Sequence, residues 1–140
     1  MIHRERLPED IEKRVENAIA LMNNEKNIIF AYLFGSLARG ERKPLSDIDL
    51  AVYLKSTRKV AQYKLNLITK LIECLGTEEF DLVILNKAPI SLAGRILMTR
   101  KVIVDKIPTI RHSYESLTLR QFSDFSIKET QILKRSFKLG

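Results

Sequence analysis

Two strand-like segments, residues 27–34 and 47–54, constrain the fold of this chain more than any other feature of its sequence. The first is an apolar run with aromatic side chains, which is typical of a buried strand, and it stops at Gly35-Ser36. In the second, the apolar side chains at even positions share one strand face, whereas Asp47 and Asp49 share the other. The sequence therefore predicts a buried strand, a Gly-Ser turn and a strand with two carboxylates on one face.

Helical and strand-like patterns alternate through the rest of the chain. Pro8, followed by two acidic residues, predicts a helix start, and apolar residues then recur with helical spacing as far as Met22. The other expected elements are a helix over 57–75 that ends at Gly76, strands over 80–85 and 101–104, a short helix over 89–99 and a mostly helical remainder. No repeat, low-complexity tract or linker interrupts this order. The pattern predicts one α/β domain over residues 1–140, in which residues 106–140 form a helical, basic C-terminal extension.

The composition of the 140 residues suits a globular protein, since 45% of them are hydrophobic and can form a core. The longest apolar run, residues 28–34, is far shorter than the roughly 20 residues that cross a bilayer, so no membrane span is expected. The N-terminal residues lack the apolar core of a signal peptide, which predicts a cytoplasmic protein. Cys74 has no cysteine partner in the chain, and its place in a helical apolar pattern predicts a buried structural thiol.

The net charge of +7 is concentrated towards the C-terminus. Residues 100–140 hold nine Lys/Arg and four Asp/Glu, and so contribute +5. Such a tail could attract nucleic acid, a nucleotide or an acidic protein, and charge alone does not choose among them. Four basic residues near the end form either a solvated surface or a docking surface for an acidic partner: Lys128, Lys134, Arg135 and Lys138.

The turn at Gly35-Ser36 has the features of a phosphate-binding site. Glycine lets the backbone approach a bulky anion, and a helix that begins near Ser36 would direct free N–H groups and the positive end of its dipole at a phosphate. The hydroxyl of Ser36 adds a donor. Arg39 lies in the same stretch and is compatible with a phosphate contact, with exposure to solvent or with an ion pair to Glu41.

Three acidic residues are candidates for a metal site. Asp47 and Asp49 project from one strand face, so their carboxylates can hold a divalent cation jointly. Oxygen ligands favour Mg²⁺ or Mn²⁺ over zinc, for which the sequence offers no Cys/His cluster. Asp81 starts another apolar strand, where a buried carboxylate is costly unless a cation or hydrogen bonds compensate it. A phosphate-binding turn beside three carboxylates is what nucleotidyl transfer with two metal ions requires.

These residues resemble the signature of the DNA polymerase β-like nucleotidyltransferase superfamily, which here reads Gly35-Ser36, then Ser46-Asp47-Ile48-Asp49-Leu50-Ala51-Val52, then Asp81. The Gly-Ser-Leu-Ala-Arg-Gly form of residues 35–40 and the segment 80–89 are similar to the minimal nucleotidyltransferases, or MNT proteins. The resemblance covers about residues 28–105 well and the helical tail loosely. It implies the polymerase β-like nucleotidyltransferase fold, a small mixed sheet flanked by helices.

The resemblance also implies an activity and a partner. MNT proteins are antitoxins encoded beside HEPN ribonuclease toxins, and they transfer AMP from ATP to a tyrosine hydroxyl of the toxin. The residues that match the nucleotide site are Gly35, Ser36, Arg39 and Ser46. The residues that match the catalytic, metal-binding acids are Asp47, Asp49 and Asp81. Two Mg²⁺ ions, ATP as substrate and a hetero-oligomer with a HEPN toxin follow from the resemblance, with a homodimer as the form of the chain alone.

Other functions remain open at the level of sequence. A binding module could neutralise a toxin by masking its surface, without chemistry. Transfer to a small molecule such as an aminoglycoside is disfavoured, because 140 residues leave little material to enclose such an acceptor. Nucleic acid is a weaker candidate still, and the aromatic residues Tyr114, Phe122 and Phe125 are expected to pack within the protein rather than to stack on bases. The preference for ATP over other triphosphates comes from the resemblance alone.

Overall fold

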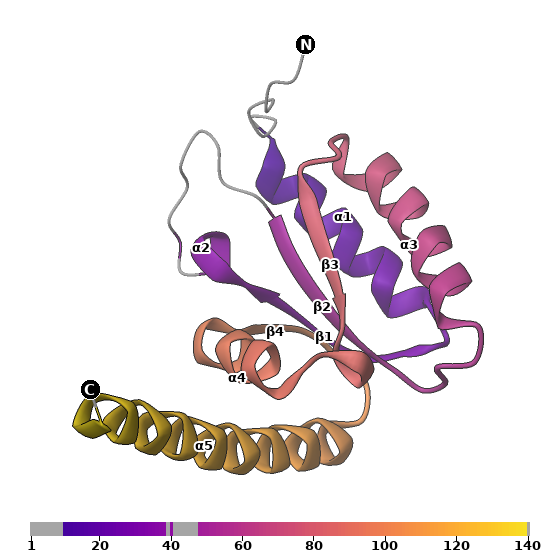
Figure 1. The fold of residues 1–140 in the computed structure, drawn as a ribbon. Coiled ribbons are helices and arrows are strands. Elements are labelled where there is room, and N and C mark those ends of the chain that lie inside the picture. Colours follow the sequence, from indigo (N-terminus) through magenta and orange to yellow (C-terminus); the bar gives the residue numbers. More distant parts are fainter. Residues whose placement is uncertain (1–9, 39, 41–47, 140) are drawn as a thin grey trace.

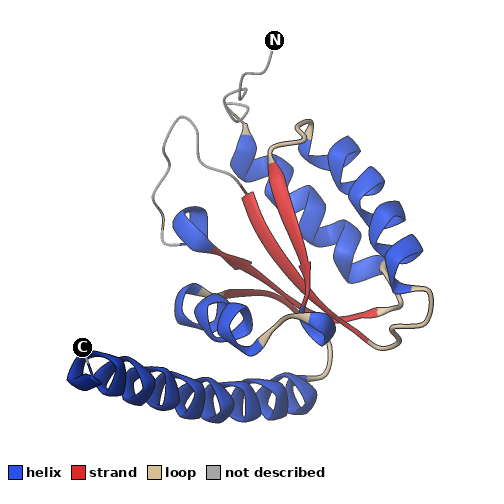
Figure 2. Ribbon diagram, viewed as in Figure 1, coloured by secondary structure: helices blue, strands red, loops and turns tan. Residues whose placement is uncertain are grey.

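The computed structural model of the chain describes residues 10–38, 40 and 48–139, which form a four-stranded sheet with helices on both faces (Figure 1, Figure 2). The helices are α1 (Ile11–Asn24), α2 (Gly35–Ala38), α3 (Val60–Leu75), α4 (Ile90–Thr99) and α5 (Pro108–Leu139), with a short 3-10 helix η1 at Leu85–Lys87. The strands are β1 (Ile28–Phe34), β2 (Ile48–Leu54), β3 (Phe80–Ile84) and β4 (Lys101–Asp105). This architecture confirms the fold class expected from the sequence.

The sheet is mixed, with the strand order β3-β2-β1-β4. β1 is antiparallel to both β2 and β4, whereas β2 and β3 are parallel. A parallel pair needs a crossover connection, and α3 supplies it between β2 and β3. The register of this pair places Asp49 opposite Asp81 and Ala51 opposite Val83. Two acids that are far apart in the sequence therefore lie on neighbouring strands.

The core has two layers because the side chains of each strand alternate between the faces of the sheet. The apolar face of β2 packs with α1 and α3, and the core on that side includes Leu50, Val52, Leu67 and Leu71. The core on the other side lies under α4 and α5, and it includes Phe30, Tyr32, Ala51, Ile96 and Leu97. Figure 1 shows α1 and α3 together on one side of the sheet, and α4 and α5 on the other. Asp49, which alternates with Leu50, belongs to the α4/α5 face.

The element boundaries follow the predicted ones with small differences. α3 ends where expected, because Gly76 adopts a φ of +67° and its N–H donates to Ile72 O at 2.9 Å. The predicted helix start at Pro8 lies outside the described residues, and α1 begins at Ile11. Residue 85 opens η1 instead of ending β3.

The prediction of a buried structural thiol at Cys74 holds only in part. Cys74 is only partly buried, although it packs against the core between α1 and α3. Leu71 and Leu75 occupy the centre of the buried stripe of α3, and Cys74 lies at its edge. Its thiol is therefore a marginal core group.

α5 is a continuous helix of 32 residues, about 48 Å long at 1.5 Å per residue. The predicted packing of Tyr114 is confirmed, since its ring lies 5.6 Å from that of Phe30 and 5.2 Å from that of Tyr53. For Phe125 the same prediction is wrong, because this side chain is 39% exposed on the part of α5 that extends past α4 (Figure 1). None of the helices described combines the length and the apolar character that a membrane span needs.

Candidate active site

The turn after β1 comes very close to Asp49. Phe34, the last residue of β1, pairs with Asp49 in the antiparallel register, and Gly35 follows with a φ of +75°. A Cβ atom at position 35 would lie 2.5 Å from Asp49 Oδ2, a distance that real Cβ atoms essentially never show. Glycine is therefore required here both for the left-handed backbone and for room beside the carboxylate. The chain enters α2 at Gly35, so a helical turn begins where the sequence predicted it.

Asp49 and Asp81 lie side by side on the sheet. Their Cα atoms are partners in the parallel register of β2 and β3, where neighbouring strands are about 4.8 Å apart. Paired residues in a sheet project from the same face, so the two carboxylates can contribute oxygen atoms to one cation. Like charges opposite each other destabilise a sheet, and a divalent cation bound between the two carboxylates would relieve their repulsion.

The sequence-based expectation that Asp81 is buried is wrong. Asp81 is exposed, because β3 is an edge strand and Asp81 lies near its open end. It also borders a hollow between β3 and α3, together with Lys64 and Glu78. Asp49, on the inner strand β2, is half-buried. A group bound between the two carboxylates would thus contact the protein on one side and solvent on the other.

Thr99 belongs to the site, and sequence reasoning missed it. The backbone N–H of Gly35 donates to Thr99 Oγ1 at 3.0 Å. Thr99 is the last residue of α4, so this hydrogen bond joins the turn after β1 to a helix 64 residues further along the chain. The only sequence signal is a polar residue at the end of a mostly apolar helix, which is too common to indicate a role.

Several predicted site residues lie outside the part of the chain that the structure describes: Arg39, Ser46 and Asp47. For Ser36 the backbone position within α2 is described, and the side chain is not. Among the residues covered, no three His, Cys, Asp or Glu side chains gather closely enough to hold a metal ion. Asp49 and Asp81 are the described members of the expected triad, and the role of Asp47 remains a prediction.

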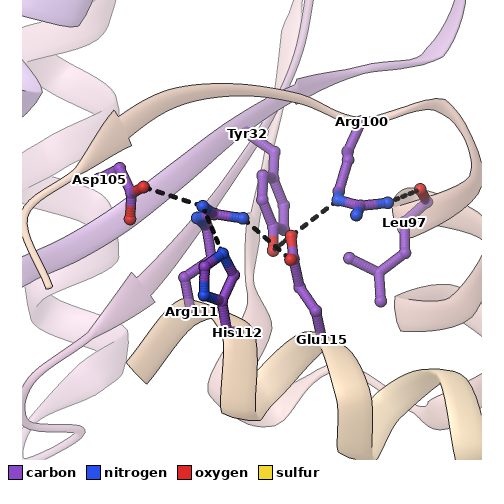
Figure 3. A network of polar contacts seen from close by, with 7 residues as sticks. All are labelled: Tyr32, Leu97, Arg100, Asp105, Arg111, His112 and Glu115. Atoms are coloured by element: carbon purple, nitrogen blue, oxygen red, sulfur yellow. Dashed lines mark hydrogen bonds and ion pairs between the residues drawn. The ribbon is translucent and has the colours of Figure 1, made fainter. Parts of the chain in front are cut away.

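A polar network ties α5 to the same face of the sheet (Figure 3). Glu115 on α5 is 6% exposed, and its Oε2 accepts hydrogen bonds from Tyr32 Oη and Arg100 Nε, both at 2.7 Å. Arg111 Nη1 donates to Glu115 Oε1 at 2.9 Å. Arg111 Nη2 pairs with Asp105 Oδ2 at 3.0 Å. The network therefore connects β1, the end of α4, β4 and α5.

The surroundings of Glu115 keep its carboxylate ionised. Burial alone would raise the pKa of Glu115, but the hydrogen bond from Tyr32 and the charges of Arg100 and Arg111 outweigh burial and lower the pKa below its usual value. Burial raises the pKa of Tyr32, and the hydrogen bond to the Glu115 carboxylate raises it further. Both groups have fixed protonation states near neutral pH, which suits a structural cluster better than proton transfer.

The network also holds the end of α4. Arg100 directly follows Thr99, and its Nη1 donates to Leu97 O in the last turn of α4 at 2.6 Å. With Nε bound to Glu115, the side chain of Arg100 fixes the helix end from which Thr99 reaches Gly35. Sequence reasoning missed this link too, because Tyr32 and Glu115 are 83 residues apart and no local pattern relates them.

The chemistry of the described residues fits a divalent cation and a phosphate. Asp49 and Asp81 supply the oxygen donors that Mg²⁺ or Mn²⁺ prefers. Gly35 leaves beside Asp49 the space that any side chain would fill. A cation held by the carboxylates could therefore be contacted by an anion that lies against the turn, which is the arrangement of metal-assisted phosphoryl or nucleotidyl chemistry.

Comparison with protein families gives an independent view of the chain. The family described as Polymerase beta, Nucleotidyltransferase matches residues 16–108, two thirds of the chain. The matched range contains every residue of the predicted site and ends at the start of α5. No curated protein matches the sequence.

Solved structures share the fold. A chain from a crystal structure of a toxin-antitoxin with AMP-PNP has a TM-score of 0.69 and 23% sequence identity, with 90% of this chain and 98% of that chain covered. A chain from tri-AMPylated Shewanella oneidensis HEPN toxin in complex with MNT antitoxin has a TM-score of 0.65 and 21% identity, covering 89% and 98%. A chain from the toxin-antitoxin MntA-HepT has a TM-score of 0.63 and 21% identity, covering 93% and 99%. At these identities the likeness shows the fold.

Proposed function

The chain belongs to the Polymerase beta, Nucleotidyltransferase family, and we propose that it is the antitoxin of a toxin–antitoxin pair that transfers AMP from ATP to a tyrosine of a HEPN-family toxin. The observation that carries the chemistry is the in-register pairing of Asp49 with Asp81 beside the Gly35 turn. The toxin as acceptor is suggested by the solved structures with this fold, which are described as toxin–antitoxin complexes. We place the reaction in the cytoplasm, where ATP is available.

Two Mg²⁺ ions, for which Mn²⁺ could substitute, would be held by Asp49 and Asp81 together with Asp47. When bound, such ions lower the pKa of an attacking hydroxyl and neutralise the charge that develops on the leaving pyrophosphate. Gly35 and Ser36 would lie against the triphosphate, where the absence of a side chain at position 35 lets the backbone approach. Arg39 and Ser46 are the other residues that we assign to the nucleotide site.

The transfer is a single displacement at the α-phosphorus of ATP. The tyrosine oxygen forms a bond to the α-phosphorus, and the bond from that phosphorus to the oxygen bridging to the β-phosphate breaks. Pyrophosphate leaves with the bonding electron pair, and the hydroxyl proton passes to the Asp81 carboxylate, which is the exposed member of the pair. The remaining task of the protein is to hold the reacting groups in line.

Support for ATP and for a protein acceptor comes from the solved structures that share this fold. One of them contains AMP-PNP, which is an ATP analogue, and another contains a tri-AMPylated HEPN toxin. Support from this chain itself is its size. The described residues form one sheet with two helical layers, and they include no separate substrate domain that could enclose an acceptor.

The test is a labelling reaction. The protein is incubated with ATP labelled in the α-phosphate, Mg²⁺ and the product of the adjacent gene, and protein-bound label is measured after electrophoresis. We expect label on a tyrosine of that product, and we expect EDTA to abolish it. Absence of label on the partner, with the metal present and the protein folded, would contradict the proposal, and label on a small molecule instead would favour the alternative acceptor.

A masking role without chemistry can be separated from catalysis in cells. A variant with both Asp49→Asn and Asp81→Asn retains the shape of the site and loses the charge that holds the cation. If catalysis neutralises the toxin, this variant fails to protect cells that express the toxin, although it still binds it. Full protection by the variant would show that binding alone is sufficient.

A further inference from the structure

The distal half of α5, defined here as residues 123–139, continues the helix face that packs on the protein body. Counted from Phe122, positions 125, 129, 132 and 133 lie on one side of a helix that turns about 100° per residue. The same side holds Glu115 and Thr118, which are 6% and 4% exposed. One helix face is thus buried at the start of α5 and exposed towards its end.

Phe122 marks the point at which packing on α4 ends. Its ring lies directly against Gly94 of α4, where an added Cβ would collide with it. Beyond Phe122, residues 123–135 are exposed apart from the partly buried Ser126. Figure 1 shows this yellow part of α5 running on past α4. The helix is therefore longer than the surface that the described protein offers to it.

The exposed apolar residues on this face form a ridge, which we define as Phe125, Ile132 and Leu133, and the exposed acid Glu129 lies among them. The three ridge residues are 39%, 62% and 53% exposed. Single exposed apolar residues are normal on protein surfaces, but these align at helical spacing and continue a buried face. An exposed row of apolar side chains on a helix can be bound by a groove that accepts them.

The charge of the distal half of α5 indicates which kind of groove could bind it. Residues 126–139 contain four Lys/Arg and one acid, Glu129. Lys128, Lys134 and Arg135 are all exposed. Two copies of this helix side by side would bring like charges together, which is unfavourable. A surface that is apolar in the centre and acidic at the rim would match both the ridge and the charge.

We propose that the distal half of α5 docks into an apolar groove with an acidic rim on the protein that receives the nucleotidyl group. The identity of that acceptor rests on the proposed function. α5 lies on the face of the sheet that carries Asp49, because Ile110 and Tyr114 pack against the cluster that contains Ala51. Docking along α5 therefore holds the acceptor on the same side of the sheet as the catalytic carboxylates.

The test compares two surfaces of the same helix. Ile132→Gln with Leu133→Gln removes most of the ridge, whereas Ile127→Gln is a matched control, because Ile127 is 54% exposed and lies on the opposite side of α5. All three residues are exposed, so the helix content and melting temperature of each variant should equal those of the wild type. Binding to the purified product of the adjacent gene is measured by calorimetry, without ATP or metal.

We expect the ridge variant to bind about 100-fold more weakly, which corresponds to two apolar side chains that no longer become buried. The control should stay within about threefold of the wild type. Equal binding by the ridge variant and the wild type, equal loss in the control, or no binding of the wild type would overturn the proposal.

The acidic rim is tested separately with Lys134→Gln and Arg135→Gln. We expect these changes to weaken binding several-fold at low salt and to reduce the dependence of affinity on ionic strength. An affinity that does not change with salt would contradict the acidic rim. If the wild type alone sediments as a dimer and the ridge variant sediments as a monomer, a second copy of the chain covers this face. The proposal would then be wrong.

Failure of this proposal can be told apart from failure of the proposed function. If binding depends on the ridge but no label is transferred, the docking surface is supported and the proposed chemistry is contradicted. If the ridge variant transfers label as fast as the wild type, the proposed chemistry is supported and the docking surface is contradicted. Asp49→Asn should lose labelling and retain binding.

Discussion

Two carboxylate clusters lie on the same face of this sheet, and the residues that surround them differ. Glu115 is surrounded by Tyr32 and by two arginines that neutralise its charge. Asp49 and Asp81 are instead placed opposite each other in register, beside a turn kept free of side chains. The carboxylate of the first cluster is hydrogen-bonded and charge-paired by the residues around it, and the cluster holds α5 to the sheet. The second brings like charges together, which is reasonable for a site that binds a cation.

The largest effect should come from Asp49→Asn, because the amide keeps the shape of the side chain and loses the charge that would hold the proposed cation. We expect AMP transfer to fall by about 10³-fold, roughly 4 kcal/mol of transition-state stabilisation. The free energy of unfolding should change by less than about 1 kcal/mol. Initial rates of labelling and chemical denaturation measure the two quantities.

Glu73→Gln is the matched control for this change. Glu73 is an exposed acid on α3, away from the α4/α5 face, and its neutralisation should leave the rate of transfer within about twofold. If Asp49→Asn retains the wild-type rate, or if Glu73→Gln loses it equally, Asp49 does not hold a catalytic cation and the contrast between the clusters disappears.

Glu115→Gln should have the opposite profile. Removing one member of a buried ionic cluster leaves Arg100 and Arg111 without their shared carboxylate, and we expect a loss of about 3 kcal/mol in the free energy of unfolding. Glu129→Gln, an exposed change on the same helix, should cost less than about 0.5 kcal/mol. Equal stability of the Glu115→Gln variant and the wild type would mean that the network does not anchor α5.

The same cluster predicts a pH dependence of stability. The pKa of Glu115 in the folded protein lies below its ordinary value of 4.5, so the folded state favours the ionised form. This contribution is fully present above about pH 4.5 and is lost as the pH falls through the pKa of the folded state. Thermal unfolding from pH 7 downward should therefore show a smaller decline in Glu115→Gln than in the wild type. An identical decline in the two proteins would contradict this assignment.

The described members of one cluster have local sequence signals, whereas the members of the other do not. Asp49 and Gly35 follow from strand alternation and from the end of an apolar run, which are local patterns. The register that pairs Asp49 with Asp81 depends on the crossover through α3, yet the strand acid could be named because its segment is short and apolar. The Glu115 network joins residues from four elements, and none of its members has a local signature.

The sequence pattern also failed to predict burial where burial depends on which other element packs against a residue. Asp81 is exposed because β3 is at the edge of the sheet, which an apolar segment does not reveal. Phe125 is exposed because α5 extends beyond α4, although Phe125 lies on the same side of the helix as the packed residue Tyr114. Periodicity indicates the face of an element, whereas burial requires a neighbour along its whole length.

Gly35→Ala tests whether the turn beside Asp49 needs empty space. A Cβ here collides with Asp49 Oδ2 and also occupies a backbone region at φ +75° that L-residues avoid. Gly40 is a close control, because its φ is +79° and no atom lies within 4 Å of the added Cβ. We expect transfer to fall about 30-fold in Gly35→Ala, and the backbone strain of about 1–2 kcal/mol to appear in both variants. Equal rates in the two variants would show that strain alone matters.

Thr99→Val should give the smallest effect and the most specific one. Valine keeps the shape of threonine and removes the hydroxyl that accepts the Gly35 N–H, so the turn loses one hydrogen bond worth about 1 kcal/mol. If this bond positions the turn against the triphosphate, the KM for ATP should rise about fivefold while kcat changes little. Steady-state kinetics over a range of ATP concentrations measure both.

Thr99→Ser separates positioning from packing, because serine restores the hydroxyl and lacks the methyl group. Rescue of the KM by serine would assign the effect to the hydrogen bond, whereas a KM as high as that of the valine variant would assign it to the packing of the methyl group. Thr99 is held by the end of α4, and Arg100 ties that end to Glu115. A raised KM in Glu115→Gln under conditions where the protein is folded would therefore show that the Glu115 network supports the turn beside Asp49, and an unchanged KM would show that the two act independently.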